Sequence, residues 1–108
     1  MADAGQQVAQ LRHVLGLVEQ IAGRDTPSSA GDAALDEGAR ISSAYWDAAP
    51  IVQRRFDTLS SETAAWAATA VEALLAAQGS DAPPRAPAAR MADELRTALK
   101  ELARILKL

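Results

Sequence analysis

The segment from Pro50 to Gln78 is amphipathic along its whole length, and its second half is apolar on nearly two sides. Its first apolar stripe recurs at helical spacing and consists of Val52, Phe56, Leu59, Thr63, Trp66, Ala70 and Ala77. A second row lies about a third of a turn away and consists of Ala64, Ala68, Val71 and Leu75. A helix with two apolar rows requires two neighbours, because each row has to be shielded from water separately. The pattern therefore predicts a long helix at the centre of a helical fold.

Whether this helix is continuous stays open at the Ser60–Ser61 pair. A helix of roughly 28 residues would measure about 42 Å. Serine can cap a new helix, so a break between Leu59 and Ser61 is one alternative. We prefer the continuous version, because the apolar stripe runs through the pair without interruption.

Three further helices are predicted, at residues 6–22, 32–48 and 88–107. Their apolar stripes are Val8, Leu11, Leu15, Val18 and Ala22 in the first, Leu35, Ala39, Ser42, Trp46 and Ala49 in the second, and Met91, Leu95, Ala98, Leu99, Leu102, Ile105 and Leu106 in the third. Gly23 matches a helix C-cap, Pro50 predicts a corner, and residues 79–87 form a Pro-rich linker.

The chain has 108 residues, which corresponds to one domain. Alanine is abundant and β-branched residues are scarce, so helix propensity dominates. We expect an all-α fold, an antiparallel helical bundle of about four helices with one long central helix. The expected core is Leu11, Leu15, Val18, Leu35, Trp46, Val52, Phe56, Trp66, Ala70, Leu95, Leu99 and Leu102, with both tryptophans as its large anchors.

The sequence argues against an enzyme. It contains no cysteine, which rules out disulfides and thiolate chemistry, and it has no phosphate-binding glycine loop and no Glu-x-x-His pair. We expect no cofactor, no metal site and no small-molecule substrate. The first residues lack the features of a signal peptide, and the most apolar stretch is too short to span a membrane, so the expected location is the cytoplasm.

Charge is divided unevenly along the chain. The total is −3, but residues 1–84 carry a net −6 and residues 85–108 a net +3. An acidic chain is a poor candidate for nucleic-acid binding. The last helix nevertheless has a basic face of Arg96, Lys100, Arg104 and Lys107, which could contact anionic lipid, nucleic acid or an acidic partner. The alternative is that this helix docks on the acidic remainder of the chain.

His13 is the only histidine, and it falls away from the apolar stripe of its helix, beside Ala9 and Gly16. An exposed histidine with small neighbours, in a helical chain of this length, resembles the phosphoacceptor of histidine phosphotransfer domains. That resemblance implies phosphoryl transfer from a receiver domain to His13. The motif departs from the family at the third and fourth positions after the histidine, where lysine and glycine are usual and Gly16 and Leu17 stand here. The other interpretation is an ordinary surface histidine.

The surplus apolar row leads to the functional hypothesis. A contiguous apolar surface that its own bundle does not cover generally marks an association site. We therefore expect a non-enzymatic helical interaction or regulatory protein that forms a homodimer, with Ala64, Ala68, Val71 and Leu75 as the candidate interface. Phosphotransfer through His13 is the alternative. The sequence does not identify any other protein partner.

Overall fold

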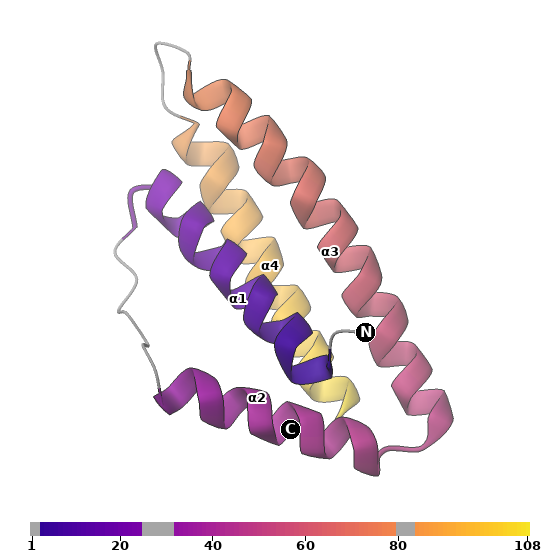
Figure 1. Ribbon diagram of the computed structural model, residues 1–108. Coiled ribbons are helices and arrows are strands. Elements are labelled where there is room, and N and C mark those ends of the chain that lie inside the picture. Colours follow the sequence, from indigo (N-terminus) through magenta and orange to yellow (C-terminus); the bar gives the residue numbers. More distant parts are fainter. Residues whose placement is uncertain (1–2, 25–31, 80–83) are drawn as a thin grey trace.

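The chain folds into four α-helices in the computed structural model, which describes residues 3–24, 32–79 and 84–108. The helices are α1 (Ala4–Ile21), α2 (Asp32–Asp47), α3 (Pro50–Gln78) and α4 (Arg85–Ile105). Three of them, α1, α3 and α4, lie side by side, while α2 crosses one end (Figure 1). The described part of the chain has no strand, so the all-α bundle is confirmed.

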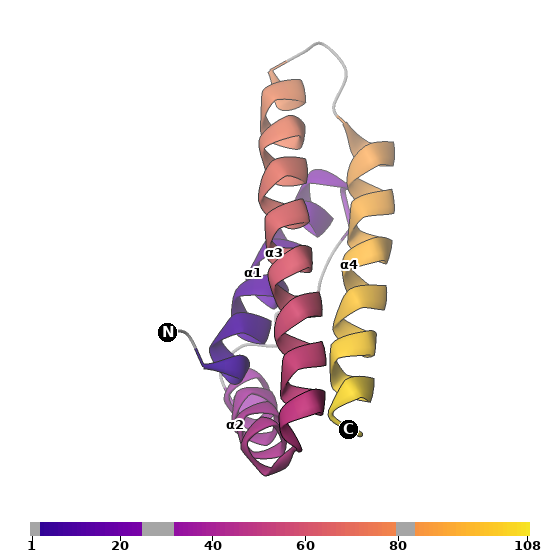
Figure 2. The same cartoon turned by 90° about the vertical axis from the view of Figure 1, so that its right-hand side faces the viewer.

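The crossing helix sets the directions of the other three. Seen at a right angle to the first view, α2 lies almost end-on beneath α1 and α3 (Figure 2). Because α2 runs across the bundle end instead of along it, α1 and α3 point the same way and α4 returns antiparallel to both (Figure 1). The helix that packs against each of the other three is α1, whereas the longest helix, α3, packs mainly against α4 and α1.

Both ends of α1 are closed by local hydrogen bonds. Asp3 is the N-cap: its carboxylate accepts from the backbone N–H of Gly5, and the side chain of Gln6 accepts from the backbone N–H of Asp3. At the other end, Gly23 adopts a left-handed conformation with φ 76°, as expected for the residue after a helix C-cap. The N–H of Arg24 then reaches back to the carbonyl of Glu19, which returns Arg24 toward the bundle.

The long helix is continuous, as we preferred from the sequence. Pro50 occupies its first turn, where no intrahelical N–H bond is needed. The serine pair causes no break, because Ser60 is buried and its hydroxyl donates to Oε1 of Gln7 on α1 at 2.7 Å. That hydroxyl therefore joins two helices instead of capping a new one.

The last helix begins earlier than the Pro-rich segment suggested. We placed residues 79–87 in a linker, but α4 starts at Arg85, and Pro87 lies in its first turn. Proline is tolerated there because the first N–H groups of a helix have no intrahelical acceptor. Residues 80–83 lie outside the described part of the chain.

The core follows most of the predicted stripes, but both tryptophan anchors were assigned wrongly. Phe56, Leu95, Leu102 and Val18 are completely or almost completely buried. Trp46 is 70% exposed and Trp66 is 36% exposed, so neither tryptophan is a buried anchor. The side chain of Leu35 lies outside the described part of the structure. The helix α2 instead turns its Ile41 side inward, so the line through Ala39 and Trp46 faces solvent.

The reason lies in the contact between α1 and α2. A Cβ atom at Gly5 would collide with the backbone carbonyl oxygen of Gly38, so these two backbones touch directly. The hydroxyl of Ser42 donates to the carboxylate of Asp3 at 2.6 Å, next to this contact. With Gly38 against α1, Trp46 is rotated out of the core, where it stacks edge-on against Tyr45 at a centroid distance of 5.2 Å.

Candidate interaction surface

The two apolar rows of α3 have different neighbours. Leu59, from the first stripe, lies in a surface hollow beside Glu101 and Ile105 of α4. The second row faces α1, because Ala64, Ala68 and Val71 line a groove whose opposite wall belongs to that helix. The helices α1 and α4 therefore flank α3 on opposite sides, but only α4 packs closely along its stripe. Three of the four predicted interface residues, Ala64, Ala68 and Val71, come together in this groove.

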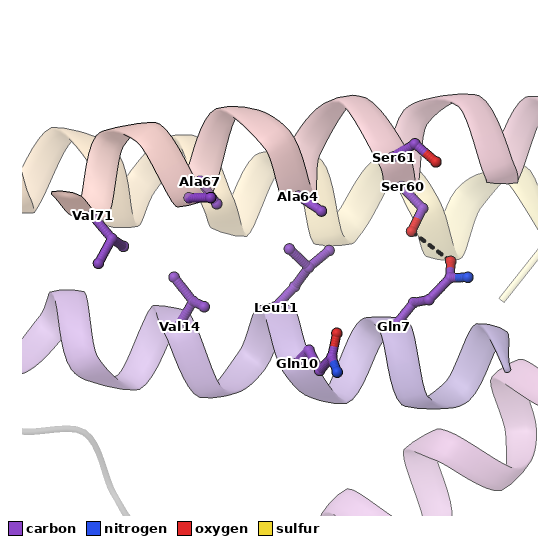
Figure 3. Close-up of a pocket in the computed structure, with 10 residues that line it drawn as sticks. Gln7, Gln10, Leu11, Val14, Ser60, Ser61, Ala64, Ala67 and Val71 are labelled. Carbon is purple, nitrogen blue, oxygen red and sulfur yellow. Dashed lines mark hydrogen bonds between the residues drawn. The ribbon is translucent and has the colours of Figure 1, made fainter. Parts of the chain in front are cut away.

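The α1–α3 groove has a volume of about 420 Å³. Its lining consists of Gln7, Gln10, Leu11, Val14, Ser60, Ser61, Ala64, Ala67, Ala68 and Val71. In the close-up, Leu11 and Val14 point from α1 toward Ala64 and Val71 of α3, and the Ser60–Gln7 hydrogen bond closes one end (Figure 3). The wall formed by α3 consists mostly of alanine and serine, whose short side chains cannot fill the space up to α1.

The α1–α3 groove carries no charge. All of its lining residues are uncharged, although the chain contains 11 basic and 14 acidic residues. Three other surface hollows between described helices include charged side chains, such as Arg54 and Glu101 beside Ile51, or Asp47 and Lys107 beside Val52. Among these four hollows, the α1–α3 groove is the best suited to an apolar occupant.

The predicted interface continues beyond the groove. Leu75 follows Ala68 by two helical turns on the same side of α3, and its side chain is 56% exposed. On α1, Leu17 follows Gln10 by two turns and is also exposed. Exposed apolar side chains thus continue from the α1–α3 groove toward the last turns of both helices.

The groove stays open because α1 is held firmly on its other sides. Glu19 of α1 is completely buried, and Nη2 of Arg96 on α4 lies 2.6 Å from its Oε1 atom. Nη1 of Arg24 lies 3.8 Å from the same oxygen and 3.1 Å from Oδ1 of Asp93. These four charged residues form the Glu19 cluster, which ties the C-terminal end of α1 to α4.

The charges in the Glu19 cluster balance. The hydrogen bond to Asp93 raises the pKa of Arg24, whose guanidinium is cationic. Both carboxylate oxygens of Glu19 lack an aligned hydrogen bond within the described residues, so ion pairing is what compensates the buried charge. In the middle of α1, Arg12 donates two hydrogen bonds of 3.0 Å to the carboxylate of Glu37 on α2.

Sequence reasoning missed the Glu19 cluster. Glu19 follows Val18 directly and lies four residues after Leu15, so its position at the edge of the apolar stripe was a usable signal. Arg96 was assigned to a solvent-facing basic face, but it reaches Glu19. Lys100, Arg104 and Lys107 are exposed, as that face requires, and Arg104 lies 3.6 Å from Glu101. The alternative that the last helix docks on the acidic remainder of the chain therefore accounts for the position of Arg96.

His13 is exposed on α1, on the side away from the core. A Cβ atom added at Gly16, almost one turn further along, would meet no atom within 4 Å beyond its own local backbone, so the surface beside the imidazole is open. No hydrogen bond or ion pair joins His13 to another residue of the described chain. The histidine and the α1–α3 groove lie on different sides of α1 and do not form one site.

No protein-family model, no curated protein and no solved structure matches the chain. Over the residues that the structure describes, no helix has the length and apolar character needed to cross a membrane. Within the same residues, no three acidic or histidine side chains gather where they could hold a metal ion.

Proposed function

We propose that this chain is a non-enzymatic helical interaction protein that associates with a second copy of itself through the α1–α3 groove. The observation that carries the proposal is the open groove, lined only by uncharged residues and bordered by the exposed Leu75. Covering such a surface removes apolar area from water without burying a charge. A regulatory role would follow if association changes which faces of the bundle are available.

Sedimentation of the purified chain over a range of concentrations tests the proposal. We expect a monomer at low micromolar concentration and a dimer at high micromolar concentration. The Ala68→Arg variant places a charge in the α1–α3 groove and should raise the dissociation constant by about 100-fold or more, because that charge would be desolvated at the interface.

Thr69→Arg is the matched control for Ala68→Arg. Thr69 is exposed on the adjacent position of α3, outside the groove, so the same charge there should leave the dissociation constant within about threefold of the original. A monomeric original chain at high micromolar concentration would remove the proposal. Equal effects of the two arginines would show that another surface mediates association.

A second candidate function is phosphoryl transfer through His13. The exposed imidazole and the open surface at Gly16 support it, since a receiver domain needs close access to the accepting nitrogen. Incubating the chain with a phosphorylated receiver should then label the original protein and not His13→Gln. Equal labelling of both proteins, or of neither, would rule this function out for the receiver tested.

A further inference from the structure

A smaller hollow lies where α1, α2 and α4 meet, with a volume of about 120 Å³. We call it the Arg40 hollow, and its lining consists of Val8, Arg12, Glu37, Arg40, Ile41, Leu99, Ala103 and Leu108. Three of these side chains, Val8, Ile41 and Leu99, belong to the core and are each at most 5% exposed. The hollow therefore has an apolar floor that is already formed by three packed helices.

The charges around this floor do not cancel. Arg12 donates two hydrogen bonds of 3.0 Å to the carboxylate of Glu37, so these two residues neutralise each other. Arg40 lies three residues after Glu37 on α2 and forms no hydrogen bond or ion pair with another residue of the described chain. Its guanidinium is a cation with five N–H donors. The Arg40 hollow thus carries one uncompensated positive charge, whereas the α1–α3 groove carries none.

We infer that the Arg40 hollow binds a small monocarboxylate that has a short hydrocarbon group. The carboxylate accepts two parallel N–H bonds from Arg40, the paired geometry for which a guanidinium is suited. The hydrocarbon group covers Val8, Ile41 and Leu99 and removes their remaining apolar surface from water. This inference does not rest on self-association, because a monomer has the same hollow.

Size and charge exclude other classes of ligand. The volume is small beside the roughly 300–1,000 Å³ of sites for drug-sized molecules, so the ligand has only a few carbon atoms. Inorganic phosphate has no hydrocarbon group, and its second negative charge would find no free cation in the hollow. An alcohol of the same length would leave Arg40 without an anionic acceptor. A ligand with one charged group and few carbons binds weakly, with a dissociation constant in the millimolar range.

Titration with pentanoate at neutral pH and constant ionic strength, followed by backbone amide NMR, tests the inference. We expect saturable chemical-shift changes that cluster on Val8, Arg40, Ile41 and Leu99. Acetate lacks most of the hydrocarbon group and 1-pentanol lacks the charge, so each should bind about tenfold more weakly or worse. Inorganic phosphate should bind as weakly as acetate.

Arg40→Gln removes the cation from the hollow and should raise the dissociation constant of pentanoate about tenfold or more. Arg54→Gln is the matched control, because Arg54 lines a different hollow on α3 and also lacks a described ion-pair partner. This variant changes the net charge equally and should leave the dissociation constant within about twofold. Both arginines are exposed, and thermal unfolding followed by circular dichroism confirms that each variant folds.

Four outcomes would overturn the inference. Equal weakening by the two glutamine variants would mean that pentanoate responds only to the overall charge. Acetate or 1-pentanol binding as tightly as pentanoate would remove the role of the apolar floor or of Arg40, respectively. Shifts centred on Ala64 and Ala68 would place pentanoate in the α1–α3 groove instead. Shifts that do not saturate within the millimolar range would show that the Arg40 hollow binds no such compound.

Discussion

The helix α1 contacts α4 and α3 in two different ways. Against α4 it buries the carboxylate of Glu19 beneath the guanidinium of Arg96, and the surrounding apolar side chains of both helices are closely packed. Against α3 it contributes the Gln7–Ser60 hydrogen bond at one end and an open groove beyond it. A buried ion pair and a glycine contact fix where a helix lies, even when this leaves an apolar face uncovered. The position of α1 is thus set by α2 and α4, and the face toward α3 remains available.

The largest expected effect concerns the glycine contact between α1 and α2. Gly5→Ala should destabilise the fold by about 2–3 kcal/mol, because the added methyl group collides with the backbone of Gly38. Gly16→Ala is the matched control on the same helix and should stabilise it by about 0.5–1 kcal/mol, since its methyl group has space and alanine favours helix. Chemical unfolding at low protein concentration measures both. If Gly5→Ala proved as stable as the original, α1 would not be fixed by this contact.

A smaller loss is expected when the Glu19 cluster is broken. Arg96→Met should cost about 2 kcal/mol, because it leaves a buried carboxylate with only the more distant Arg24, although water can partly replace the half-exposed guanidinium. Lys100→Met, one turn further along α4, should change the free energy of unfolding by less than about 0.5 kcal/mol.

The double variant Glu19→Met with Arg96→Met sharpens this prediction. It removes the buried charge together with its partner, so it should recover most of the stability lost in Arg96→Met. A double variant less stable than Arg96→Met would show that Glu19 is held by something other than the ion pair.

The smallest effect is expected on the groove side of α1. Ser60→Ala removes the hydroxyl that donates to Gln7 and should cost about 0.5–1 kcal/mol in the same unfolding experiment. The difference between the stability losses of Arg96→Met and Ser60→Ala measures how much more tightly α1 is held on α4 than on α3. A loss at Ser60 equal to that of Arg96→Met would mean that α1 is held as tightly on α3 as on α4.

The sequence predicted the helices, which depend on the periodicity of apolar residues. It did not predict the side-chain positions that are determined by a tertiary contact. The long helix followed from the spacing of residues such as Phe56 and Ala68. Its buried side runs between the two predicted rows, because the buried residues Ser60, Ala67 and Leu74 belong to neither row. The exposure of Trp46 could not be read from the stripe, because it results from the contact of Gly38 with Gly5, which are distant in sequence. The pairing of Arg96 with Glu19 was missed for the same reason. A charged residue at the edge of an apolar stripe is assigned to the solvent-facing side as long as the helix that packs beside it is unknown.

The most direct test of the open α1–α3 face is a dilution series followed by backbone amide NMR. We expect concentration-dependent chemical-shift changes to cluster on Gln10, Ala64, Ala68 and Val71, with the amides of Lys100 and Arg104 on the outer side of α4 unaffected. Shifts confined to α4, or spectra that do not change from low to high micromolar concentration, would contradict the claim that α1 leaves this face of α3 free to bind a second copy.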